Sequence, residues 1–330
     1  MMNLRKILAV GTLLAFSQLN TAATSSPTAA IFDLGSLDTM AALGLEAHVV
    51  GVPKQTLPDY LTQFKDARYT DVGGLKTPDM ETLKALSPDI VVITGRQAAS
   101  KAELATVSTV KQVDASSDDY WQSLRNNVTS LTALFDAKAS ADTALAALNT
   151  SIETSKMAIE GAPTVLFVTH NNGSFGLRDE PIATQLLGLT TSPLPAQVKP
   201  QQRGTRTFTS LTVSDMAEMT PTTLFIIDRS AAIGNTKEAL DIEKFKADLA
   251  AQGGQSIKVA YLSPKLWYLS GNGLQSLNNR KLLNRFFNMF TATNTCGIDK
   301  SIFFIVTHIR NINTVTGGAW HVINHNTVFA

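Results

Sequence analysis

Apolar runs of four to seven residues alternate along the chain with segments in which apolar residues recur every three or four positions. The first pattern predicts buried strands and the second predicts amphipathic helices. Strands are expected at 29–34, 47–52, 90–95, 164–170, 223–228 and 258–263. Because strands that alternate with helices are typical of parallel sheets, the chain is predicted to be an α/β protein.

Helical patterns lie between these strands. Residues 37–45 and 77–86 are two examples, and the second opens with Thr77 as the expected N-cap and Pro78 in the first turn. A further helix is expected to begin near Leu274, where apolar residues again recur at spacings of three and four.

The middle of the chain has a different pattern. Residues 118–159 contain no strand signal, no Pro and no Gly, and an apolar stripe runs through Leu145, Leu148 and Ile152. A flexible linker would be rich in Gly, Ser or Pro, so we expect a helix here. The helix is predicted over 137–160, between an N-terminal lobe at 24–136 and a C-terminal lobe at 161–292. The alternative is one more surface helix of a single domain.

The first 23 residues are typical of a secretory signal peptide. Arg5 and Lys6 precede an apolar stretch over 7–16, and Thr21 and Ala23 form a small-residue cleavage site. A retained membrane anchor is the alternative, but a stretch of about ten residues is too short for a bilayer of about 30 Å. Because no cysteine follows the stretch, we expect an exported, soluble protein without a lipid anchor.

Charge and cysteine content narrow the function classes. Removal of the signal leaves 26 of the 28 Lys and Arg against 27 Asp and Glu, a balance that favours neither nucleic acid nor an anionic membrane as partner. The single cysteine, Cys296, cannot form an internal disulfide, so the hydrophobic core must stabilise the fold. Residues 293–330 are predicted to be an atypical extension, with His321 and His325 four apart, and no function is assigned to them.

Two arginines occupy matching positions. Arg96 lies eight residues after Pro88, and Arg229 lies eight residues after Pro221, each at the end of a predicted strand. Ligands of open parallel sheets bind beyond the carboxyl ends of the strands, so the pair predicts two cationic walls of one cleft. The alternative is that each arginine caps a helix or pairs with a carboxylate.

Further residues are expected at the same edge. Arg178 lies on the predicted loop after strand 164–170, Arg203 and Arg206 lie on a second loop, and Trp267 and Tyr268 precede a Gly-Asn-Gly turn. Arginine binds oxyanions through its planar fork and stacks on rings. The sequence therefore predicts a cleft for a large, flat, anionic ligand.

Four segments carry a resemblance to a known family: "FDLGSLDTMAALGL", "VGGLKTPDMETLKALSPDIVVITGRQ", "FIIDR" and "WYLSGNGLQSL". They resemble periplasmic binding proteins for ferric catecholate siderophores, over about residues 29–292. The resemblance implies the class III fold of such proteins, two Rossmann-like lobes with parallel sheets joined by one long backbone helix. It also implies a periplasmic carrier, not an enzyme, that delivers its ferric siderophore to an ABC permease of the inner membrane.

The resemblance also implies site roles. Arg96, Arg229 and, with a different local spacing, Arg178 match arginines that hold the anionic iron complex. Tyr268 matches a tyrosine that can ligate ferric iron, and a phenolate is a hard donor suited to this ion. No permanent cofactor is implied, and a monomer is expected. Glu81 and Asp215 are the expected permease contacts.

Some alternatives stay open. Relatives that use the tyrosine as an iron ligand pair it with a histidine, but the matching loop here, "RGTRTFTS", has none. His170 is a candidate for completing the iron shell, and its other expected role is packing. Cobalamin, haem or a hydroxamate siderophore are alternative ligands. An exported hydrolase is a further alternative, although the chain has no G-x-S-x-G motif.

Overall fold

The computed structural model describes residues 26–114, 118–204 and 206–280. The chain divides into two units, residues 1–288 and 289–330, and every described residue belongs to the first. The predicted signal peptide and the predicted extension at 293–330 lie outside the described residues. Among the helices of the described part, none is long and apolar enough to cross a membrane.

The first sheet is built from the strands of the N-terminal half. Its order is β3-β2-β1-β6-β7, and all its described pairings are parallel. The central strands are entirely apolar and entirely buried, as expected of a parallel strand with both faces covered. The strands are β1 (Ala29–Ile31), β2 (Val49–Val52), β3 (Thr70–Asp71), β6 (Ile90–Ile93) and β7 (Thr109–Gln112).

The second sheet follows later in the chain, in the order β13-β9-β8-β14-β15 with β10 paired to β8. Its centre is parallel, β9 pairs antiparallel with β8, and β13 pairs antiparallel with β9. The strands are β8 (Thr164–Asn171), β9 (Ser174–Leu177), β10 (Thr190–Thr191), β13 (Ser210–Leu211), β14 (Thr223–Asp228) and β15 (Lys258–Leu262). Two small hairpins complete the set: β4 (Gly73–Gly74) with β5 (Thr77–Pro78), and β11 (Gln201–Arg203) with β12 (Arg206–Phe208).

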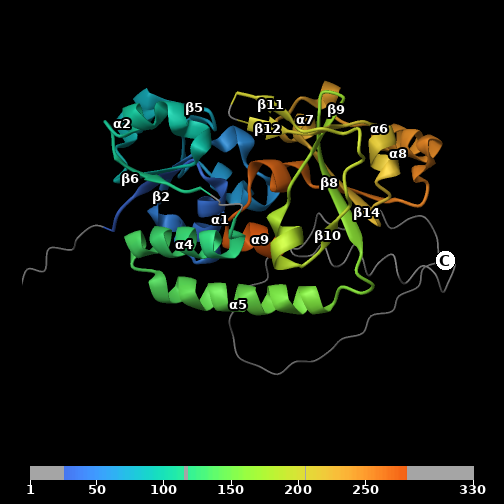
Figure 1. The fold of residues 1–330 in the computed structure, drawn as a ribbon. Helices are drawn as coiled ribbons and strands as arrows, with labels where there is room; N and C mark the ends of the chain where they lie inside the picture. Colours follow the sequence, from blue (N-terminus) through green and yellow to red (C-terminus); the bar gives the residue numbers. More distant parts are fainter. Residues whose placement is uncertain (1–25, 115–117, 205, 281–330) are drawn as a thin grey trace, which may run out of the picture. The chain divides into compact units, whose positions relative to one another are not determined.

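Helices pack around both sheets (Figure 1). The α-helices are α1 (Leu34–Ala42), α2 (Met80–Leu86), α3 (Lys101–Leu104), α4 (Tyr120–Thr132), α5 (Lys138–Met157), α6 (Val213–Glu218), α7 (Arg229–Ala232), α8 (Ile242–Leu249) and α9 (Leu274–Arg280). Short 3₁₀ or π turns are η1 (Glu46–His48), η2 (Lys54–Thr56), η3 (Asp59–Lys65), η4 (Gly95–Ser100), η5 (Ala133–Phe135), η6 (Ile182–Leu186), η7 (Thr236–Glu238), η8 (Ala250–Gly254) and η9 (Lys265–Leu269).

All six predicted strands are present, with β14 matching its predicted range and the others differing at their ends. The predicted first strand ended at 34, but the observed strand ends at Ile31, because Asp33 caps α1 by accepting a hydrogen bond from the Ser36 N–H. Thr77 is not an N-cap, and that prediction was wrong. The Asp79 carboxylate accepts from the backbone of Glu81 and Thr82, so α2 begins at Met80.

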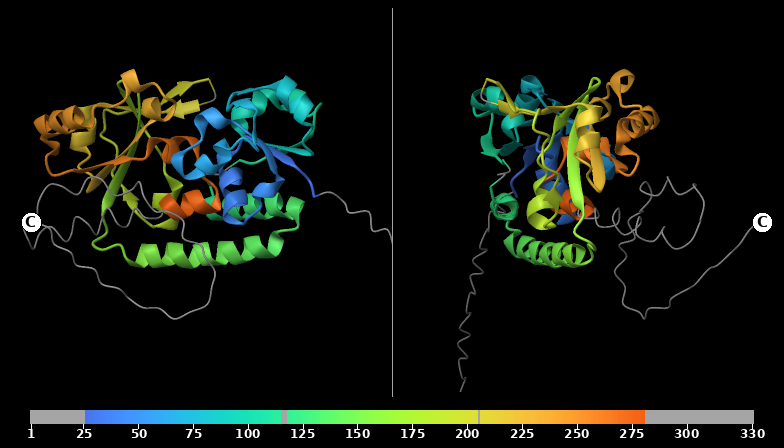
Figure 2. Two further views of the ribbon diagram at one scale, coloured as in Figure 1. Left: turned by 180° about the vertical axis from the view of Figure 1, so that it is seen from behind. Right: turned by 45° about the vertical axis from the view of Figure 1, so that its right-hand side comes forward.

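The predicted helix at 137–160 is α5, and it follows α4 after a break at Asp136, whose φ of 53° is left-handed. Figures 1 and 2 show α5 lying beside α4 and α9. The apolar stripe predicted from the sequence faces these helices: Leu145, Leu148 and Ile152 are buried in one cluster with residues of α4, η6 and α9. The helix therefore contacts elements from both halves of the chain. The lobe boundaries at 136 and 161 stay a prediction.

The two halves of the chain also meet where α9 packs on α1. Asp38 of α1 is fully buried, and its carboxylate accepts from the N–H groups of Gln275 and Ser276 in the first turn of α9, each at 3.1 Å. The Tyr60 hydroxyl donates to the same carboxylate at 3.3 Å. An N-terminal helix turn has N–H groups without intrahelical partners, and Asp38 satisfies two of them from another element. Burial raises the pKa of Asp38 to about 7.

This pKa generates a prediction about pH. Because the folded protein keeps Asp38 protonated between about pH 4 and 7 while the unfolded chain does not, stability should fall as pH rises through this window. The loss should approach about 4 kcal/mol by pH 8, at 1.36 kcal/mol per pKa unit. We expect Asp38→Asn to remove this contribution, so the difference in unfolding free energy between wild type and variant, from urea titrations at pH 5 and pH 8, should change by about 2.7 kcal/mol, the part of the loss that falls between pH 5 and the folded pKa of about 7. A difference that is the same at both pH values would contradict the prediction.

Candidate functional site

Both predicted arginines follow the carboxyl end of a central strand. Arg96 lies in the first turn of η4, just after β6, and Arg229 opens α7, directly after β14. Each turn begins with a side-chain cap: Thr94 accepts from the Arg96 N–H at 3.1 Å, and Asp228 accepts from the Ala231 N–H at 3.2 Å. The strand and its terminal arginine thus recur in both sheets, as the matched spacing from proline predicted, and the structure adds a cap at each turn.

Arg229 is in direct contact with Tyr268. Its Nε donates to the Tyr268 hydroxyl at 2.7 Å, and its guanidinium carbon lies 5.6 Å from the centre of the tyrosine ring. Its Nη1 donates to the side-chain oxygen of Asn171 at 2.5 Å. Tyr268 and Arg229 are both half-buried, so each keeps part of its surface accessible. The Tyr268 hydroxyl oxygen is therefore held directly against a cationic group.

Arg96 reaches the same segment from the first half of the chain. Its Nη2 donates to the backbone carbonyl of Tyr268 at 3.0 Å, and its Nη1 donates to that of Leu269 at 3.2 Å. Arg178 reaches it from the second sheet, with Nη2 at 3.4 Å from the Trp267 carbonyl oxygen. The structure therefore brings all four predicted site residues, Arg96, Arg178, Arg229 and Tyr268, to the short turn η9. We call these four the arginine–tyrosine cluster.

Arg178 lies outside the strands, as predicted, but a hairpin strand that was not predicted precedes it. The Asn172–Gly173 pair, both with positive φ, turns the chain back into β9, and Arg178 follows that strand. Its Nε forms an ion pair with Glu180 at 3.0 Å, and Glu180 is buried. Asn-Gly between two apolar runs is a strong hairpin signal, so the sequence carried this information. Neither Asn171 nor Glu180 was among the predicted site residues.

Two other expectations change in the structure. Trp267 was expected to offer a stacking face for a ligand, but its side chain is 4% exposed and packs in the core with Phe167 at a centroid distance of 6.2 Å. His170 was a candidate for the iron shell, but it is 2% exposed. Its Nδ1 bonds to Asp228 and its Nε2 accepts from the Gly173 N–H, each at 3.0 Å. Its role is structural, because both ring nitrogens already have partners.

Asp228 organises the end of β14. Besides Ala231 and His170, it accepts hydrogen bonds from the Leu240 N–H at 2.7 Å and the Tyr261 hydroxyl at 2.9 Å. Burial alone would raise the pKa of its carboxyl, but these donors outweigh burial and hold the pKa below its usual value. The start of α7, and with it Arg229, is thereby fixed to the sheet.

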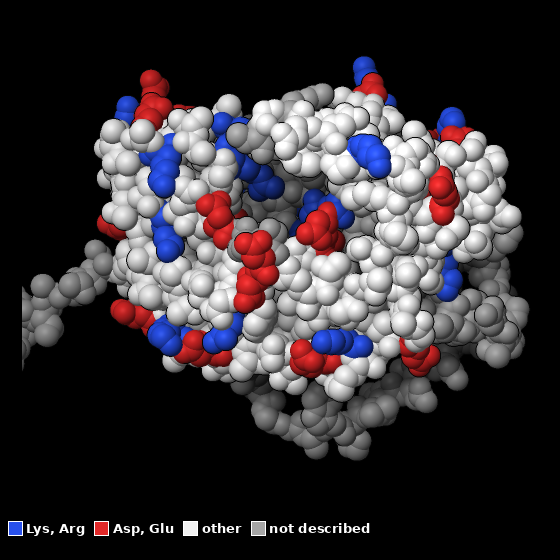
Figure 3. Space-filling view, viewed as in Figure 1, with Lys and Arg blue, Asp and Glu red and all other residues white. Residues whose placement is uncertain are grey.

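The cluster is partly accessible and cationic. Figure 3 shows a depression near the middle of the face seen in that view, with basic side chains within it and acidic side chains along its rim. Arg96 is exposed and Arg178 is partly exposed, with 27% of its side chain accessible. Among the described residues, no three His, Cys, Asp or Glu side chains are close enough together to hold a metal ion. A ligand here would meet guanidinium groups and one phenol.

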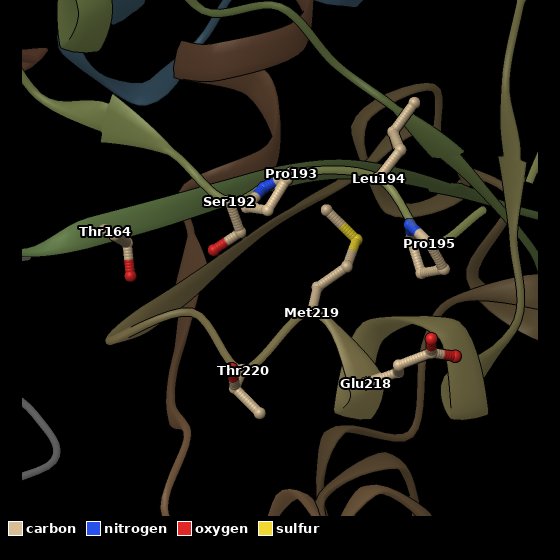
Figure 4. A pocket seen from close by; sticks show the side chains of 8 residues that line it. All are labelled: Thr164, Ser192, Pro193, Leu194, Pro195, Glu218, Met219 and Thr220. Carbon is tan, nitrogen blue, oxygen red and sulfur yellow. The ribbon is translucent and has the colours of Figure 1, made fainter.

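A separate pocket of about 400 Å³ lies at the other end of β8 (Figure 4). It lies against Thr164, the first residue of that strand, whereas His170 and Asn171 are at the opposite end. Its lining includes Met219 and Leu194, and Glu218, the one charged residue among the described lining residues, accepts from the Gln197 side chain. Among these described residues, no cationic side chain lines the pocket to bind an anion, so the arginine–tyrosine cluster is the stronger candidate for the ligand-binding site.

The two expected permease contacts lie on separate helices. Glu81 is exposed in the first turn of α2. Asp215 is half-buried in α6, where it accepts from the backbone and the hydroxyl of Thr212 in a capping box. Positions 203 and 206 are paired in the backbone register of the β11–β12 hairpin.

Comparison with known proteins gives consistent results. The sequence model of a family described as "Periplasmic binding protein" matches residues 30–253. The petrobactin-binding protein YclQ of Bacillus subtilis is 32% identical over 255 residues, which are 75% of this chain and 78% of that protein. The crystal structure of YclQ superposes with a TM-score of 0.67 at 30% identity, covering 79% of this chain and 91% of that one. The iron-uptake substrate-binding protein PiuA of Streptococcus pneumoniae superposes with a TM-score of 0.69 at 28% identity, covering 78% and 93%.

The hydrogen bonds of Asp228 generate a prediction about stability. We expect Asp228→Asn to lower the unfolding free energy by about 2–3 kcal/mol at pH 7, because the new amide group would face donors in the core. The difference from wild type should shrink below about pH 4, where Asp228 itself becomes protonated in the unfolded chain. Asp248→Asn is the matched control, since Asp248 is exposed and forms a surface ion pair with Lys244, and it should change stability by less than about 0.5 kcal/mol. Urea unfolding measures both, and equal effects of the two variants would contradict the prediction.

Proposed function

The chain belongs to the periplasmic binding protein family, and from this premise we propose that it binds a ferric catecholate siderophore at the arginine–tyrosine cluster and delivers it to an ABC importer. Its fold is the class III fold of that family, an α/β arrangement of parallel sheets and helices. The family consists of substrate-binding proteins, so the proposed activity is capture and release. No bond of the ligand is made or broken.

One observation carries the proposal. Three arginines from three different elements converge on the turn that bears Tyr268, and one of them donates directly to its hydroxyl. A ferric complex of catecholates is multiply anionic, and guanidinium groups bind such oxygens bidentately. The same cluster presents a phenol oxygen, the kind of hard donor that ferric iron accepts. The naming of the B. subtilis relative as a petrobactin-binding protein supports a siderophore as ligand.

The expected hydrogen-bond energies are sufficient for micromolar binding of the ligand. Micromolar affinity requires about 8 kcal/mol. Hydrogen bonds to charged groups contribute roughly 1.5–3 kcal/mol each, so three arginines supply roughly 5–9 kcal/mol before the cost of association. Because Trp267 is buried, only Tyr268 and the arginines of the cluster are proposed to stack on the aromatic rings of the ligand. A bond between Tyr268 and the iron would add to this affinity, but binding does not depend on it.

The remaining parts of the proposal concern delivery. We propose that the protein acts in the periplasm after removal of its signal peptide, as a monomer without a permanent cofactor and without nucleic acid as partner. Glu81 and Asp215 are the proposed contacts with arginines of the inner-membrane permease. Glu81 lies on α2 in the first half of the chain, and Asp215 lies on α6 in the second half. This placement suits a permease that contacts both halves of the carrier.

The test is a titration of the purified protein with Fe(III)–catecholate complexes, followed by tryptophan fluorescence and by the visible charge-transfer band. We expect submicromolar binding. Arg96→Gln and Arg229→Gln should each weaken it by roughly 10- to 100-fold, since each removes a charged donor. Tyr268→Phe should abolish the protein-induced shift of the band.

The controls separate the ligand classes. Arg125→Gln changes an exposed arginine on α4 outside the cluster and should leave affinity unchanged. Haem, cobinamide and a ferric hydroxamate are titrated in parallel. Binding of one of these without any response to catecholates would overturn the ligand assignment, and hydrolysis of an iron-free trilactone siderophore would overturn the assignment as a binding protein.

A further inference from the structure

The turn η9 depends on arginine side chains for its backbone hydrogen bonds. Five successive carbonyl oxygens, at positions 266–270, accept from guanidinium groups: two from Arg96, one from Arg178 and two from Arg280. A helix of one turn cannot satisfy its own carbonyl groups, so donors must come from other elements. Arg280 takes the first and the last of the five, the carbonyls of Leu266 and Ser270, each at 2.5 Å from Nη2.

Arg280 differs from the arginines of the cluster in its burial. It is 4% exposed, at the end of α9, whereas Arg96 is exposed and Arg178 and Arg229 are half-buried. Its guanidinium carbon lies 4.8 Å from the centre of the buried Trp267 ring. In the part of the chain that the structure describes, it forms no ion pair with a carboxylate, and its Nε has no hydrogen-bond partner. Arg280 therefore lies behind η9, away from any ligand of the cluster.

Stability alone gives little reason for a cation at this place. Burial of a charge costs free energy, and apolar side chains of similar volume often stabilise a core equally well. A guanidinium supplies two things that an apolar group lacks: donors that join both ends of η9, and a flat cation over the tryptophan ring. The chain also leaves room for it at Gly271, where φ is 125° and an added Cβ would lie 2.6 Å from Arg280 Nη2.

We propose that Arg280 is a positioning residue of the binding site, which holds the two ends of η9 so that the Tyr268 hydroxyl stays at Arg229 and faces the ligand. Tyr268 lies midway between the two carbonyls that Arg280 binds. Across the turn itself, the Ser270 N–H donates to the Lys265 carbonyl at 3.2 Å. The role in ligand binding rests on the proposed function, whereas the ordering of η9 does not.

The first experiment needs no ligand. Hydrogen exchange of the full-length protein, followed by mass spectrometry of peptides over 264–273, compares wild type with Arg280→Met. We expect exchange in this segment to become at least tenfold faster, while peptides of β8 and β14 keep their protection. Arg125→Met, at an exposed position of α4, is the matched control and should leave the segment unchanged. Unchanged protection of 264–273 in Arg280→Met would overturn the proposal.

The second experiment is a double-mutant cycle on binding of the Fe(III)–catecholate complex. We expect Arg280→Met to weaken binding about tenfold and to reduce the band shift that depends on Tyr268. Because Arg280 acts through Tyr268, adding it to Tyr268→Phe should weaken binding no further. Effects of the two substitutions that add fully, or full affinity in Arg280→Met, would show a merely structural role and overturn the proposal.

Arg280→Lys is a conservative variant that tests the proposal even if Arg280→Met fails to fold. It keeps the charge and the aliphatic stem but replaces the planar fork, so its exchange rate and affinity should lie between those of wild type and Arg280→Met. Exchange and affinity both equal to wild type in this variant would mean that charge alone is needed, against the proposed clamp. If the wild-type protein binds no ferric catecholate, the proposed function fails, and the exchange experiment still decides whether Arg280 orders η9.

Discussion

The close packing of the Gly271–Gly273 turn on α1 is the contact on which the rest of the site depends. An added Cβ on Gly35 would collide with the Gly271 carbonyl, and one on Gly273 would collide with the Gly35 carbonyl and with Asp38. Only glycine permits such an approach of two backbones. The turn joins η9 to α9, so its seat on α1 fixes the segment that bears Tyr268 relative to the first sheet.

Buried polar groups hold this arrangement in place from both sides. Asp38 binds the start of α9, and Arg280 binds the carbonyls of η9 from the end of the same helix. On the other side, Asp228 fixes the start of α7 and therefore Arg229. Each of these residues is buried, and each satisfies backbone groups that no regular ladder reaches. The precision of the site thus comes from groups that a ligand would not touch.

Arginines of the cluster have two roles, one in holding the backbone of η9 and one in the proposed ligand binding. Arg96 and Arg178 bind carbonyl oxygens of η9 and are also the cations proposed to bind the ligand, while Glu180 balances the charge of Arg178 within the core. Guanidinium groups have five donors in a planar fork, so one side chain can hold backbone on one edge and keep donors free on the other. A lysine has no such geometry, which explains why the site is built from arginine.

The sequence by itself determined the strands, the class of fold and the position of the two strand-end arginines. Continuous apolar runs such as 223–228 and the repeated interval from proline to arginine are local patterns. They can be recognised from neighbouring residues without knowledge of how the chain packs. The tertiary structure alone decided that Trp267 is buried and that Asp38, Asp228 and Arg280 support the site. Asp38 and Ser276 are 238 residues apart in the sequence, and a local pattern of residues cannot predict a hydrogen-bond partner at that separation. Packing brings such residues together, and only then do burial and hydrogen bonding give them their roles.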